Sequence, residues 1–508
     1  MLSRVGAGSR ICKVRTSLVW QASAVHSTLH NNPATQQQNY ATVPVTNSSH
    51  SSFVKGIQTP PTTETAQKKT LVLLGTGWGT TTILKNLDTR KYNVVVVSPR
   101  NYFLFTPLLP SCTVGTTEGR SIMDPIRHIV QRQGKAMQFY EAQCSDIDLT
   151  KKELVLEQAP DTSTASSTTV SSDVPIRIRY DHLVVGVGGT YNTFGTPGVE
   201  QYACFLKEMG DASKIRRRLK NAIEKASFSN ISEEERDRLL HVVVVGGGPT
   251  GVEFAGEVHD LVTEDLVKWV PGLSHRIKIT VIEALPNLLP SFDKRLVAYT
   301  QRTFTKNGIE MRTGTRVKEV RDKTILVSND SGESEIPYGT IVWAAGIRAR
   351  EFAHTLRGKV PEVQTSGRGL IIDDHLRVKG VEDIWALGDC TVSKYAPLAQ
   401  VASQQGKWLA KALNKMAADN AQADTFSRMA NSVEPFNYMS NGSLAYIGGE
   451  RAIAEIPLFR KNIAVGGLFA SVFWKAYCLW ELSSLRSSLS VATDWTKRSL
   501  FGRTMSVD

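Results

Sequence analysis

Three features are scarce in this 508-residue sequence: long apolar runs, paired cysteines and, near its start, acidic residues. The longest uncharged apolar stretch near the C-terminus, residues 463–474, has 12 residues, whereas a helix that spans a bilayer needs about 20. We therefore predict no transmembrane helix. The six cysteines are scattered without a C-x-x-C pair, which argues against a disulfide scaffold and a structural zinc site.

The first 63 residues, here called the leader, contain no acidic residue. Five basic residues lie in it, namely Arg4, Arg10, Lys13, Arg15 and Lys55. An Arg-bearing, hydroxyl-rich segment without acids is typical of a mitochondrial presequence, and the lack of a continuous apolar region excludes a secretory signal. We predict a presequence and disordered leader over residues 1–63. The alternative is a disordered tail without a targeting signal.

The overall composition is that of a globular protein, with 41% hydrophobic and 21% charged residues. The length suggests two to four domains. A net charge of +12 would suit nucleic acid, anionic lipid or acidic ligands, but five of the charges lie in the leader. The densest internal basic run, Arg216 to Lys220, is expected to be a solvated helix face, so we predict no nucleic-acid partner.

Two segments have the order strand, glycine turn, helix, strand that binds dinucleotides. In the first, the apolar run Leu71 to Leu74 precedes Gly75, Gly77 and Gly79, and a second run follows at Val94 to Val97. In the second, His241 to Val245 precedes three glycines, Gly246, Gly248 and Gly251, and a strand follows over Ile277 to Glu283. Two such units predict two nucleotide-binding domains.

The second glycine motif has all three glycines at the required spacing. Gly246 suits the tight turn, Gly248 the approach of backbone to pyrophosphate, and Gly251 the packing of the helix. Glu283, at the end of the following strand, is expected to bind the adenosine ribose and to favour NADH over NADPH. Glu283 lies 37 residues after Gly246, so a long helix and loop must lie between them.

The first motif departs from the pattern because Thr80 stands at the third glycine position and the second strand ends in Ser98-Pro99-Arg100. We assign this motif to FAD because of the distant pair Gly388-Asp389, whose carboxylate suits a hydroxyl of the ribityl chain. Short strands with glycine turns elsewhere, such as Thr340 to Gly346, are interpreted as domain junctions. Residues 161–173 are hydroxyl-rich and are expected to form an exposed loop.

Several segments together resemble one family. They are GTGWGTTTILKNLD, VVVVSPRNYFLFTPLLPS, GGGPTGVEFAGE, VIEALPNLLPSFD, WAAGI, ALGDC and AQVASQQGKWLAK. From about Lys69 to the C-terminus the chain resembles the mitochondrial alternative (type II) NADH:ubiquinone oxidoreductases. The resemblance implies an α/β fold with two Rossmann-like domains of the two-dinucleotide-binding flavoprotein type, FAD and NADH as cofactors, and transfer of two electrons to ubiquinone without proton pumping.

The expected domains follow from the motifs and the resemblance. They are an FAD-binding domain in two parts (69–206 and 366–415), an NADH-binding domain (241–365) and a C-terminal membrane-anchoring or dimerisation region (430–508). The resemblance implies a peripheral enzyme of the mitochondrial inner membrane, on a face that the sequence does not identify. A homodimer is also expected.

The resemblance also implies roles for single residues. Thr106 and Pro107 would pass beside the flavin ring, Ser98, Pro99 and Gly346 would line cofactor, and Glu253 would lie near nicotinamide and flavin. Gln400, Ser403 and Gln404 share one face of a predicted helix, where the uncharged amides of Gln400 and Gln404 suit quinone carbonyls. Ser403 stands where the family often has histidine. The alternatives are that Thr106 and Pro107 form a packed loop, that Glu253 serves the helix dipole, and that Gln400 and Gln404 hold a neighbouring loop.

The C-terminal region predicts contact with a lipid surface. From Phe469 onward apolar residues recur at helical spacing, with four bases between or beyond them: Arg486, Lys497, Arg498 and Arg503. This pattern is typical of a helix in a membrane interface; the alternative is a core or dimer helix. The rival functions are a disulfide reductase, a sulfide:quinone oxidoreductase and a basic flavoprotein like apoptosis-inducing factor.

Overall fold

The computed structural model describes residues 68–158, 175–418, 433–458 and 461–505. All of them belong to one of the two units of the chain, residues 55–508. The predicted presequence (1–63) and the predicted hydroxyl-rich loop (161–173) lie outside the described residues.

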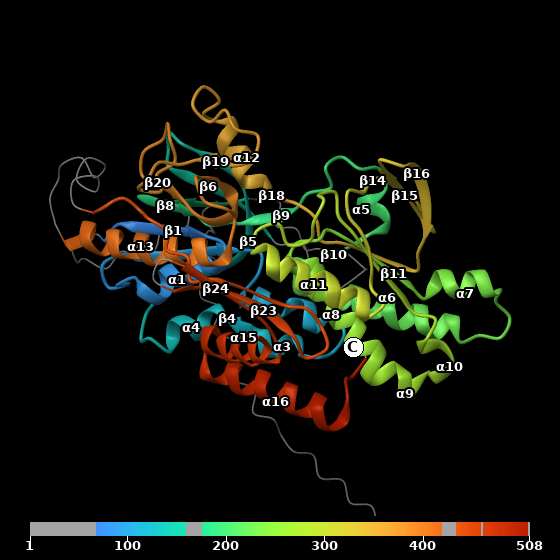
Figure 1. Ribbon diagram of the computed structural model, residues 1–508. Coiled ribbons are helices and arrows are strands. Elements are labelled where there is room, and N and C mark those ends of the chain that lie inside the picture. The colour runs from blue at the N-terminus through green and yellow to red at the C-terminus, as the bar shows by residue number, and fades with distance from the viewer. Residues whose placement is uncertain (1–67, 159–174, 419–432, 459–460, 506–508) are drawn as a thin grey trace, which may run out of the picture. The chain divides into compact units, whose positions relative to one another are not determined.

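A seven-stranded sheet carries the first glycine motif (Figure 1). Its strands, in spatial order, are β20 (Ile384–Ala386), β8 (His182–Val185), β1 (Thr70–Leu74), β2 (Asn93–Ser98), β5 (Gln138–Asp148), β6 (Glu153–Gln158) and β7 (Ile176–Arg179). The five strands from β20 to β5 are parallel, and β6 and β7 run antiparallel at one edge. The predicted buried parallel strand Leu71 to Leu74 is confirmed, since all four side chains are at most 1% exposed.

A five-stranded parallel sheet carries the second glycine motif. Its order is β10 (Cys204–Phe205), β17 (Thr340–Trp343), β11 (His241–Val245), β12 (Lys278–Ile282) and β13 (Glu310–Arg312). An antiparallel sheet of β14 (Arg316–Val320), β15 (Thr324–Asn329) and β16 (Gly332–Pro337) follows in the chain. Both faces of β11 are buried, as parallel strands between covering layers require.

Short strand pairs link the segments that leave these sheets. They are β9 (Gly189–Tyr191) with β18 (Ile347–Ala349), β3 (Tyr102–Leu104) with β4 (Met123–Pro125), and β19 (Leu370–Ile371) with β21 (Thr391–Val392). The segment after β17 thus turns at Gly346 and pairs through β18 with the segment after β8. A junction at this glycine was predicted from the sequence.

Helices and short helical turns connect the strands, and two of them begin at the glycine turns. In chain order they are α1 (Trp78–Asn86), η1 (Thr106–Leu108), α2 (Leu109–Cys112), α3 (Gly119–Ile122), α4 (Ile126–Gln131), α5 (Val199–Tyr202), α6 (Met209–Ala226), α7 (Glu233–Leu239), α8 (Pro249–Leu261), the π-helix η2 (Val262–Leu266), α9 (Val267–Trp269), α10 (Pro271–Ser274), α11 (Lys294–Lys306), α12 (Glu351–Gly358), η3 (Gly388–Cys390) and α13 (Ala399–Ala418). The run from α8 to α10 accounts for the long interval between Gly246 and Glu283.

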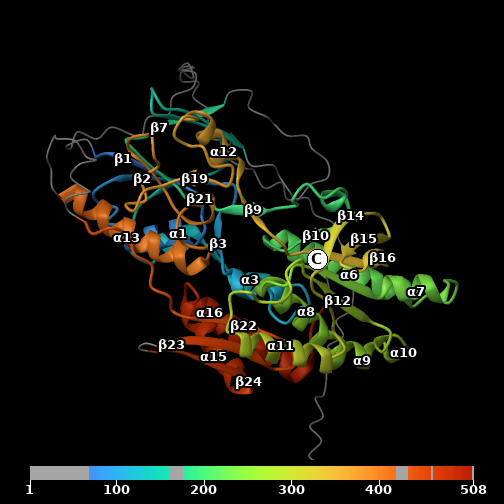
Figure 2. The same ribbon diagram turned by 45° about the horizontal axis from the view of Figure 1, so that its top comes forward.

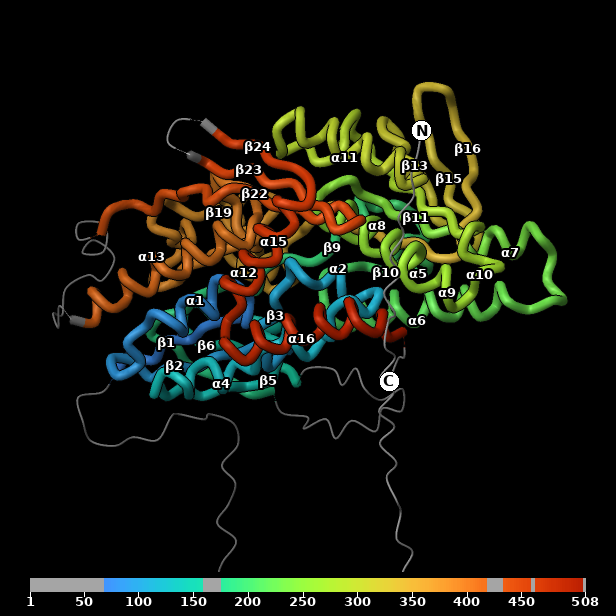
Figure 3. Tube along the Cα trace, turned by 60° about the horizontal axis from the view of Figure 1, so that its bottom comes forward, coloured from blue at the N-terminus to red at the C-terminus, as the bar shows by residue number. Residues whose placement is uncertain are grey.

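The C-terminal region is a three-stranded sheet followed by two helices (Figure 3). The strands are β22 (Ser443–Tyr446), β23 (Ala452–Leu458) and β24 (Lys461–Gly467), and the helices are α15 (Leu468–Glu481) and α16 (Leu485–Phe501). β22 packs against α8, as Figure 2 shows, and α15 packs against this sheet. Among the described residues, no helix combines the length and apolarity needed to cross a membrane.

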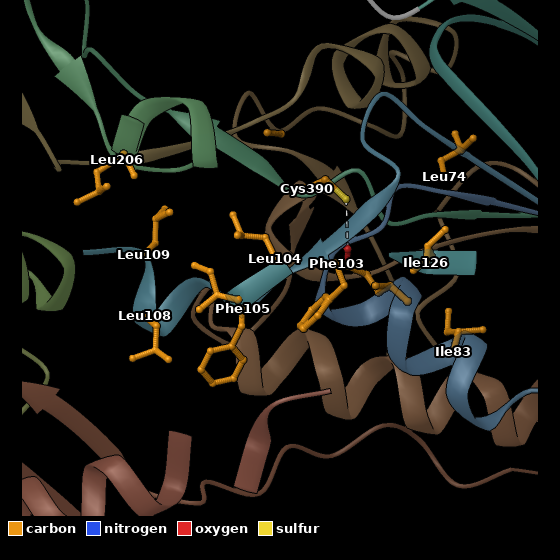
Figure 4. Close-up of a cluster of buried hydrophobic side chains, with 14 of the residues drawn as sticks. Leu74, Ile83, Phe103, Leu104, Phe105, Leu108, Leu109, Ile126, Leu206 and Cys390 are labelled. Atoms are coloured by element: carbon orange, nitrogen blue, oxygen red, sulfur yellow. Dashed lines mark hydrogen bonds between the residues drawn. The ribbon is translucent and has the colours of Figure 1, made fainter. Parts of the chain in front are cut away.

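One large hydrophobic cluster joins the first sheet to α8 and to the C-terminal helices. Figure 4 shows part of it, with Phe103, Leu104, Phe105, Leu108 and Leu109 gathered around the segment that leaves β3. Phe105 is fully buried here, so the core fixes the backbone on which Thr106 and Pro107 follow. A smaller cluster fills the space between the second sheet and β14 to β16.

Two expectations about basic residues hold only in part. In the run Arg216 to Lys220, Arg217 is exposed as expected, but the side chain of Arg216 is 11% exposed and donates to the carbonyl of Thr504. Arg498 and Arg503 are not available to lipid, because their side chains are 12% and 0% exposed and both bind Glu264. Buried guanidinium groups need anionic partners, and the chain supplies them from distant segments.

Candidate functional site

Both glycine turns leave a hollow at a helix N-terminus. Gly75 and Gly246 turn the chain with φ of +98° and +116° directly after β1 and β11. Gly77 and Gly248 are the N-caps of α1 and α8, and a Cβ on either would meet no atom within 4 Å. Free N–H groups and the helix dipole favour an anion at such a position. Each hollow therefore fits the pyrophosphate of a dinucleotide.

The third motif position differs between the two turns. A Cβ on Gly251 would lie 2.0 Å from the Gly246 carbonyl oxygen, so only glycine permits this helix packing. In the first turn Thr80 holds the equivalent place, and Gly186 makes room for it: a Cβ there would lie 2.2 Å from Thr80 Oγ1. Gly79 instead packs against Leu387, which precedes Gly388.

Glu283 lies at the second turn, as its motif predicts. Its Oε2 accepts from the Gly247 N–H at 2.6 Å and its Oε1 from the Leu285 N–H at 2.7 Å. These two bonds fix the carboxylate beside the hollow, and each oxygen keeps a lone pair for another donor. Contact with a ribose stays a prediction.

The residues proposed for the first cofactor converge on the first turn. Ser98 Oγ lies 3.1 Å from Thr76 Oγ1 and accepts from the Arg100 N–H. Pro99 follows it and is exposed. Thr106 Oγ1 accepts from the indole N–H of Trp78, the first residue of α1, at 3.1 Å.

Three further positions complete this group. The Gly388 N–H donates to Gln405 on α13 at 2.8 Å. Asp389 forms an ion pair of 3.2 Å with Lys207. Gly346 has φ +72°, and a Cβ on it would lie 2.4 Å from the Phe194 ring. The structure thus brings the first turn, β2, η3 and α13 together.

Sequence reasoning missed a group of charged residues that begins with Lys207, the partner of Asp389. Besides Lys207, Glu208 forms ion pairs with Arg100 and Arg350. These partners lie 108 and 142 residues from Glu208 in sequence. No local pattern could have indicated them, because the pairs exist only once the junction strands have folded.

Glu253 is buried on the inner face of α8. Its carboxyl accepts one hydrogen bond, from the Tyr446 N–H at 3.3 Å. Burial, helped by the negative charge of the neighbouring Glu257, raises the pKa of Glu253 to about 8 against the lowering effect of the Tyr446 N–H. A carboxyl in this state is protonated at neutral pH and can donate a hydrogen bond or a proton.

Gln400 and Gln404 hold the segment that leads to β22. The Gln400 amide donates to the Gly442 carbonyl and accepts from the Tyr438 hydroxyl and the Asn441 N–H. Gln404 makes two bonds to the Met439 backbone. The alternative that these side chains hold a loop therefore describes their contacts here. Ser403 Oγ lies 3.1 Å from Thr82 Oγ1 of α1.

The described cysteines do not suit disulfide chemistry. Cys112, Cys144, Cys204, Cys390 and Cys478 are buried and unpaired. Burial raises the pKa of Cys390 to about 12 and that of Cys112 well above the ordinary value. Because the thiolate is the reactive form, these thiols are poor nucleophiles. Among the described residues no cluster of His, Cys, Asp and Glu could hold a metal ion.

Comparison with known proteins identifies the family. The pyridine nucleotide-disulphide oxidoreductase family model matches residues 69–406, and the NDH2 C-terminal domain model matches residues 441–504. The external alternative NADH-ubiquinone oxidoreductase of Yarrowia lipolytica mitochondria is 45% identical over 476 residues, which cover 86% of this chain and 81% of that protein. The chain belongs to the mitochondrial alternative NADH-ubiquinone oxidoreductases.

Other members and a solved structure agree with this assignment. The external NADH-ubiquinone oxidoreductase 2 of Saccharomyces cerevisiae is 43% identical, with 87% of this chain and 83% of that protein covered. NDH2 of Plasmodium falciparum, solved in complex with NADH, superposes with a TM-score of 0.79 at 27% identity and covers 87% of this chain and 100% of that chain. The predicted family and two-dinucleotide flavoprotein fold are confirmed.

A sulfide:quinone oxidoreductase from Aquifex aeolicus shares the fold only. It superposes with a TM-score of 0.62 at 17% identity and covers 86% of this chain and 96% of that chain. Over a similar share of this chain, the alternative NADH-ubiquinone oxidoreductases of Yarrowia lipolytica and Saccharomyces cerevisiae are 45% and 43% identical.

Two alanine variants separate binding from packing at the second turn. Gly248→Ala is expected to fold with unchanged stability, because its φ of −73° suits alanine, and to weaken NADH binding, because the methyl group enters the hollow. Gly251→Ala is expected to lose about 1–3 kcal/mol of unfolding free energy through overpacking. Denaturant unfolding and the KM for NADH measure both effects. An unchanged KM in Gly248→Ala would place the nucleotide elsewhere.

Proposed function

We propose that this protein oxidises NADH and reduces ubiquinone, as its relatives' names state for them. The observation that carries the proposal is the pair of glycine turns with open hollows, in a chain that is 45% identical to an alternative NADH-ubiquinone oxidoreductase. FAD held at the first glycine turn would supply the two-electron redox chemistry that links a hydride donor to a quinone. The protein itself binds and orients the cofactors and substrates, and it excludes water from them.

We assign the two sheets to the two cofactors. The hollow at Gly77, with Ser98, Thr106 and Asp389 around it, suits FAD, and β20 joins residues 366–415 to the first part of that domain (69–206). The hollow at Gly248 with Glu283 suits NADH in the domain of residues 241–365. Because α8 begins at the Gly248 turn, its first inward acid, Glu253, lies at the nucleotide end of the helix.

We place the quinone beside α13 and the C-terminal region. Gln400 and Gln404 fix the Tyr438 to Gly442 segment, and the side chain of Met439 in it is 72% exposed. An exposed apolar side chain next to uncharged amides suits an apolar acceptor with two carbonyl groups. In this arrangement the two glutamines shape the pocket wall through the segment they hold.

We further propose that α15 and α16 lie on the mitochondrial inner membrane. Apolar side chains that are at least 60% exposed gather there: Leu468, Phe469, Val472, Trp480, Leu485, Leu489, Leu500 and Phe501. Arg486 and Lys497 are exposed bases on α16, which suits an anionic lipid surface. The expected homodimer stays a prediction.

The absorption spectrum tests the proposed reaction. With the full chain purified in its FAD-bound form, NADH added without oxygen is expected to bleach the flavin band, and a soluble quinone to restore it. The same experiment with sulfide in place of NADH serves as the control. Bleaching by sulfide and not by NADH would overturn the proposal in favour of the sulfide:quinone alternative.

A substitution at Glu283 tests nucleotide selectivity. Glu283→Gln keeps an acceptor for the Gly247 N–H but removes the charge that repels a 2′-phosphate. We expect the preference for NADH over NADPH, taken as the ratio of kcat/KM values, to fall by about tenfold, the value of one charged hydrogen bond. An unchanged ratio would contradict the ribose assignment.

The lipid surface is tested by vesicle sedimentation. Replacing Trp480, Leu485 and Leu489 together by serine is expected to release the protein from vesicles of zwitterionic and anionic phospholipid. Each apolar side chain withdrawn from the bilayer lowers the affinity about tenfold or more.

The matched control replaces by serine three exposed apolar side chains outside α15 and α16, namely Phe228, Trp269 and Val363. This control is expected to sediment with vesicles as the unmodified protein does. Equal release of both variants would mean that α15 and α16 are not the lipid-binding surface.

A further inference from the structure

The inner face of α8 carries a row of buried acids. Glu253, Glu257 and Asp260 follow one another at intervals of four and three residues, and their exposed fractions are 9%, 4% and 1%. Asp265 continues the row on the π-helix η2 and is 2% exposed. From Glu253 to Glu257 the helix rises about 6 Å. Like charges this close in a buried site cannot all be ionised without a cation.

Arg503, from the opposite end of the chain, supplies that cation. One of its terminal nitrogens donates to Asp265 and Glu264, each at 2.7 Å, and to the Asp260 carbonyl at 3.3 Å. Its backbone N–H donates to Asp265 at 3.2 Å. The side chain is fully buried, and its other terminal nitrogen has no hydrogen-bond partner.

Two glycines let the C-terminal arm, residues 502–505, reach this position. Gly502 has φ +82°, and a Cβ on it would lie 2.5 Å from Asp265 Oδ1. Gly115 has φ +76°, and a Cβ on it would lie 2.3 Å from the Thr504 carbonyl oxygen. Arg216 of α6 donates to that same oxygen. The arm is therefore held from three segments that are remote from one another in sequence.

Thr116 connects Arg503 to the acid row. Its hydroxyl accepts from Arg503 Nε at 2.9 Å and donates to Glu257 Oε2 at 2.6 Å. A hydroxyl has one proton to give, so its orientation here is set by both partners. It presents a donor to Glu257, which favours the ionised form of that carboxyl.

Other groups face the two glutamates from every side. Glu257 has Cys112 of α2, Asp260 and, more weakly, Arg498 of α16 as electrostatic neighbours. Tyr446 of β22 also interacts electrostatically with Glu257.

Glu253 faces Cys478 of α15 and the backbone of Tyr446. Arg503 is the first cation among the influences on Glu257, and the influences on Glu253 include no cation.

The protonation of the pair follows from these contacts. Burial raises the pKa of Glu257 to about 7, against the lowering effect of Arg503 and Thr116. Burial and the negative charge of Glu257 raise the pKa of Glu253 to about 8. Because the two sites interact, they titrate as a pair.

We propose that Arg503 is a positioning residue for the reaction: by stabilising the ionised form of Glu257 through Thr116, it makes Glu253, at the nucleotide end of α8, the first glutamate of the pair to hold a proton. The proposal rests on the proposed function, because the reduction of ubiquinone by NADH requires a proton. NADH carries a hydride and ubiquinol carries two hydrogens, so the overall reaction, NADH + H⁺ + ubiquinone → NAD⁺ + ubiquinol, consumes one proton. Glu253 holds a proton where the nucleotide is expected, and ionised Glu257 can accept the next.

The test compares three variants of the FAD-bound full chain. In Arg503→Met, Glu257 loses its cation and its pKa rises by about one unit or more. The acid limb of the kcat–pH profile is expected to move to higher pH by that amount, with the KM for NADH unchanged. Arg503→Lys keeps the charge and is expected to restore the profile. Arg498→Met removes a guanidinium that has a weaker influence on Glu257 and no contact to Thr116, so it is the matched control and is expected to move the profile much less than Arg503→Met does.

A second readout does not depend on activity. Raised carboxyl pKa values stabilise the folded state fully below the unfolded value of 4.5, and this stabilisation is lost as the pH rises through about 7 to 8. In Arg503→Met the loss is expected to extend above pH 8, so that the melting temperature falls more steeply with pH than in the unmodified protein. A merely structural arginine would shift the melting curve by a constant amount instead, and that outcome would overturn the proposal.

A double variant shows whether Arg503 acts through Glu257. Glu257→Gln fixes the second site as neutral, so adding Arg503→Met is expected to leave the kcat–pH profile unchanged, although Asp265 and Glu264 also lose their cation. Additive changes in the double variant would refute the proposal. Should Arg503→Met fail to fold, Thr116→Val is expected to give the same direction of shift, and Thr116→Ser to restore it. If NADH does not bleach the flavin of the unmodified protein, the proposed function fails, whereas the slope of stability with pH still decides the role of Arg503.

Discussion

The approach of bare backbone to a phosphate constrains both halves of this protein. A helix N-terminus attracts an anion only if no side chain lies between them, and Gly77 and Gly248 meet that condition at the starts of α1 and α8. The preceding strands must then turn sharply, which Gly75 and Gly246 allow through positive φ. The parallel strands on either side bury β1 and β11 completely, so the turns are held on rigid elements.

The helix α8 connects the nucleotide end of the protein to its C-terminal region. It starts at the Gly248 turn, packs against β22 along its length and continues into η2, where Arg503 binds. The C-terminal sheet and helices are therefore attached to the same helix whose N-terminus we propose to face the nucleotide. Since π-helical turns recur at functional sites, η2 is consistent with a role for this end of the helix beyond packing.

The sequence predicted the elements whose cause is local and missed those whose cause is remote. Glycine spacing and apolar runs indicated both turns, and helical spacing from Phe469 indicated α15. Arg498 and Arg503 were misplaced, because a basic residue in an apolar helical pattern looks the same whether it meets lipid or an acid 234 or more residues away. The partners of Gln400 and Gln404 lie more than 30 residues away in a segment without regular structure, which no periodicity reveals.

In the second glycine turn, the third motif position itself must lack a side chain. In the first turn, Thr80 has a side chain at that position, and the residue that lacks one is Gly186. Thr80 carries the side chain, its hydroxyl lies where a Cβ of residue 186 would be, and the buried hydroxyl has no hydrogen-bond partner. The steric requirement at this turn is thus a property of two residues 106 positions apart, and either one can hold a side chain provided that the other does not. Across related chains, the side-chain volumes at these two positions should therefore vary together. A motif that describes only one of the two segments omits half of this steric requirement.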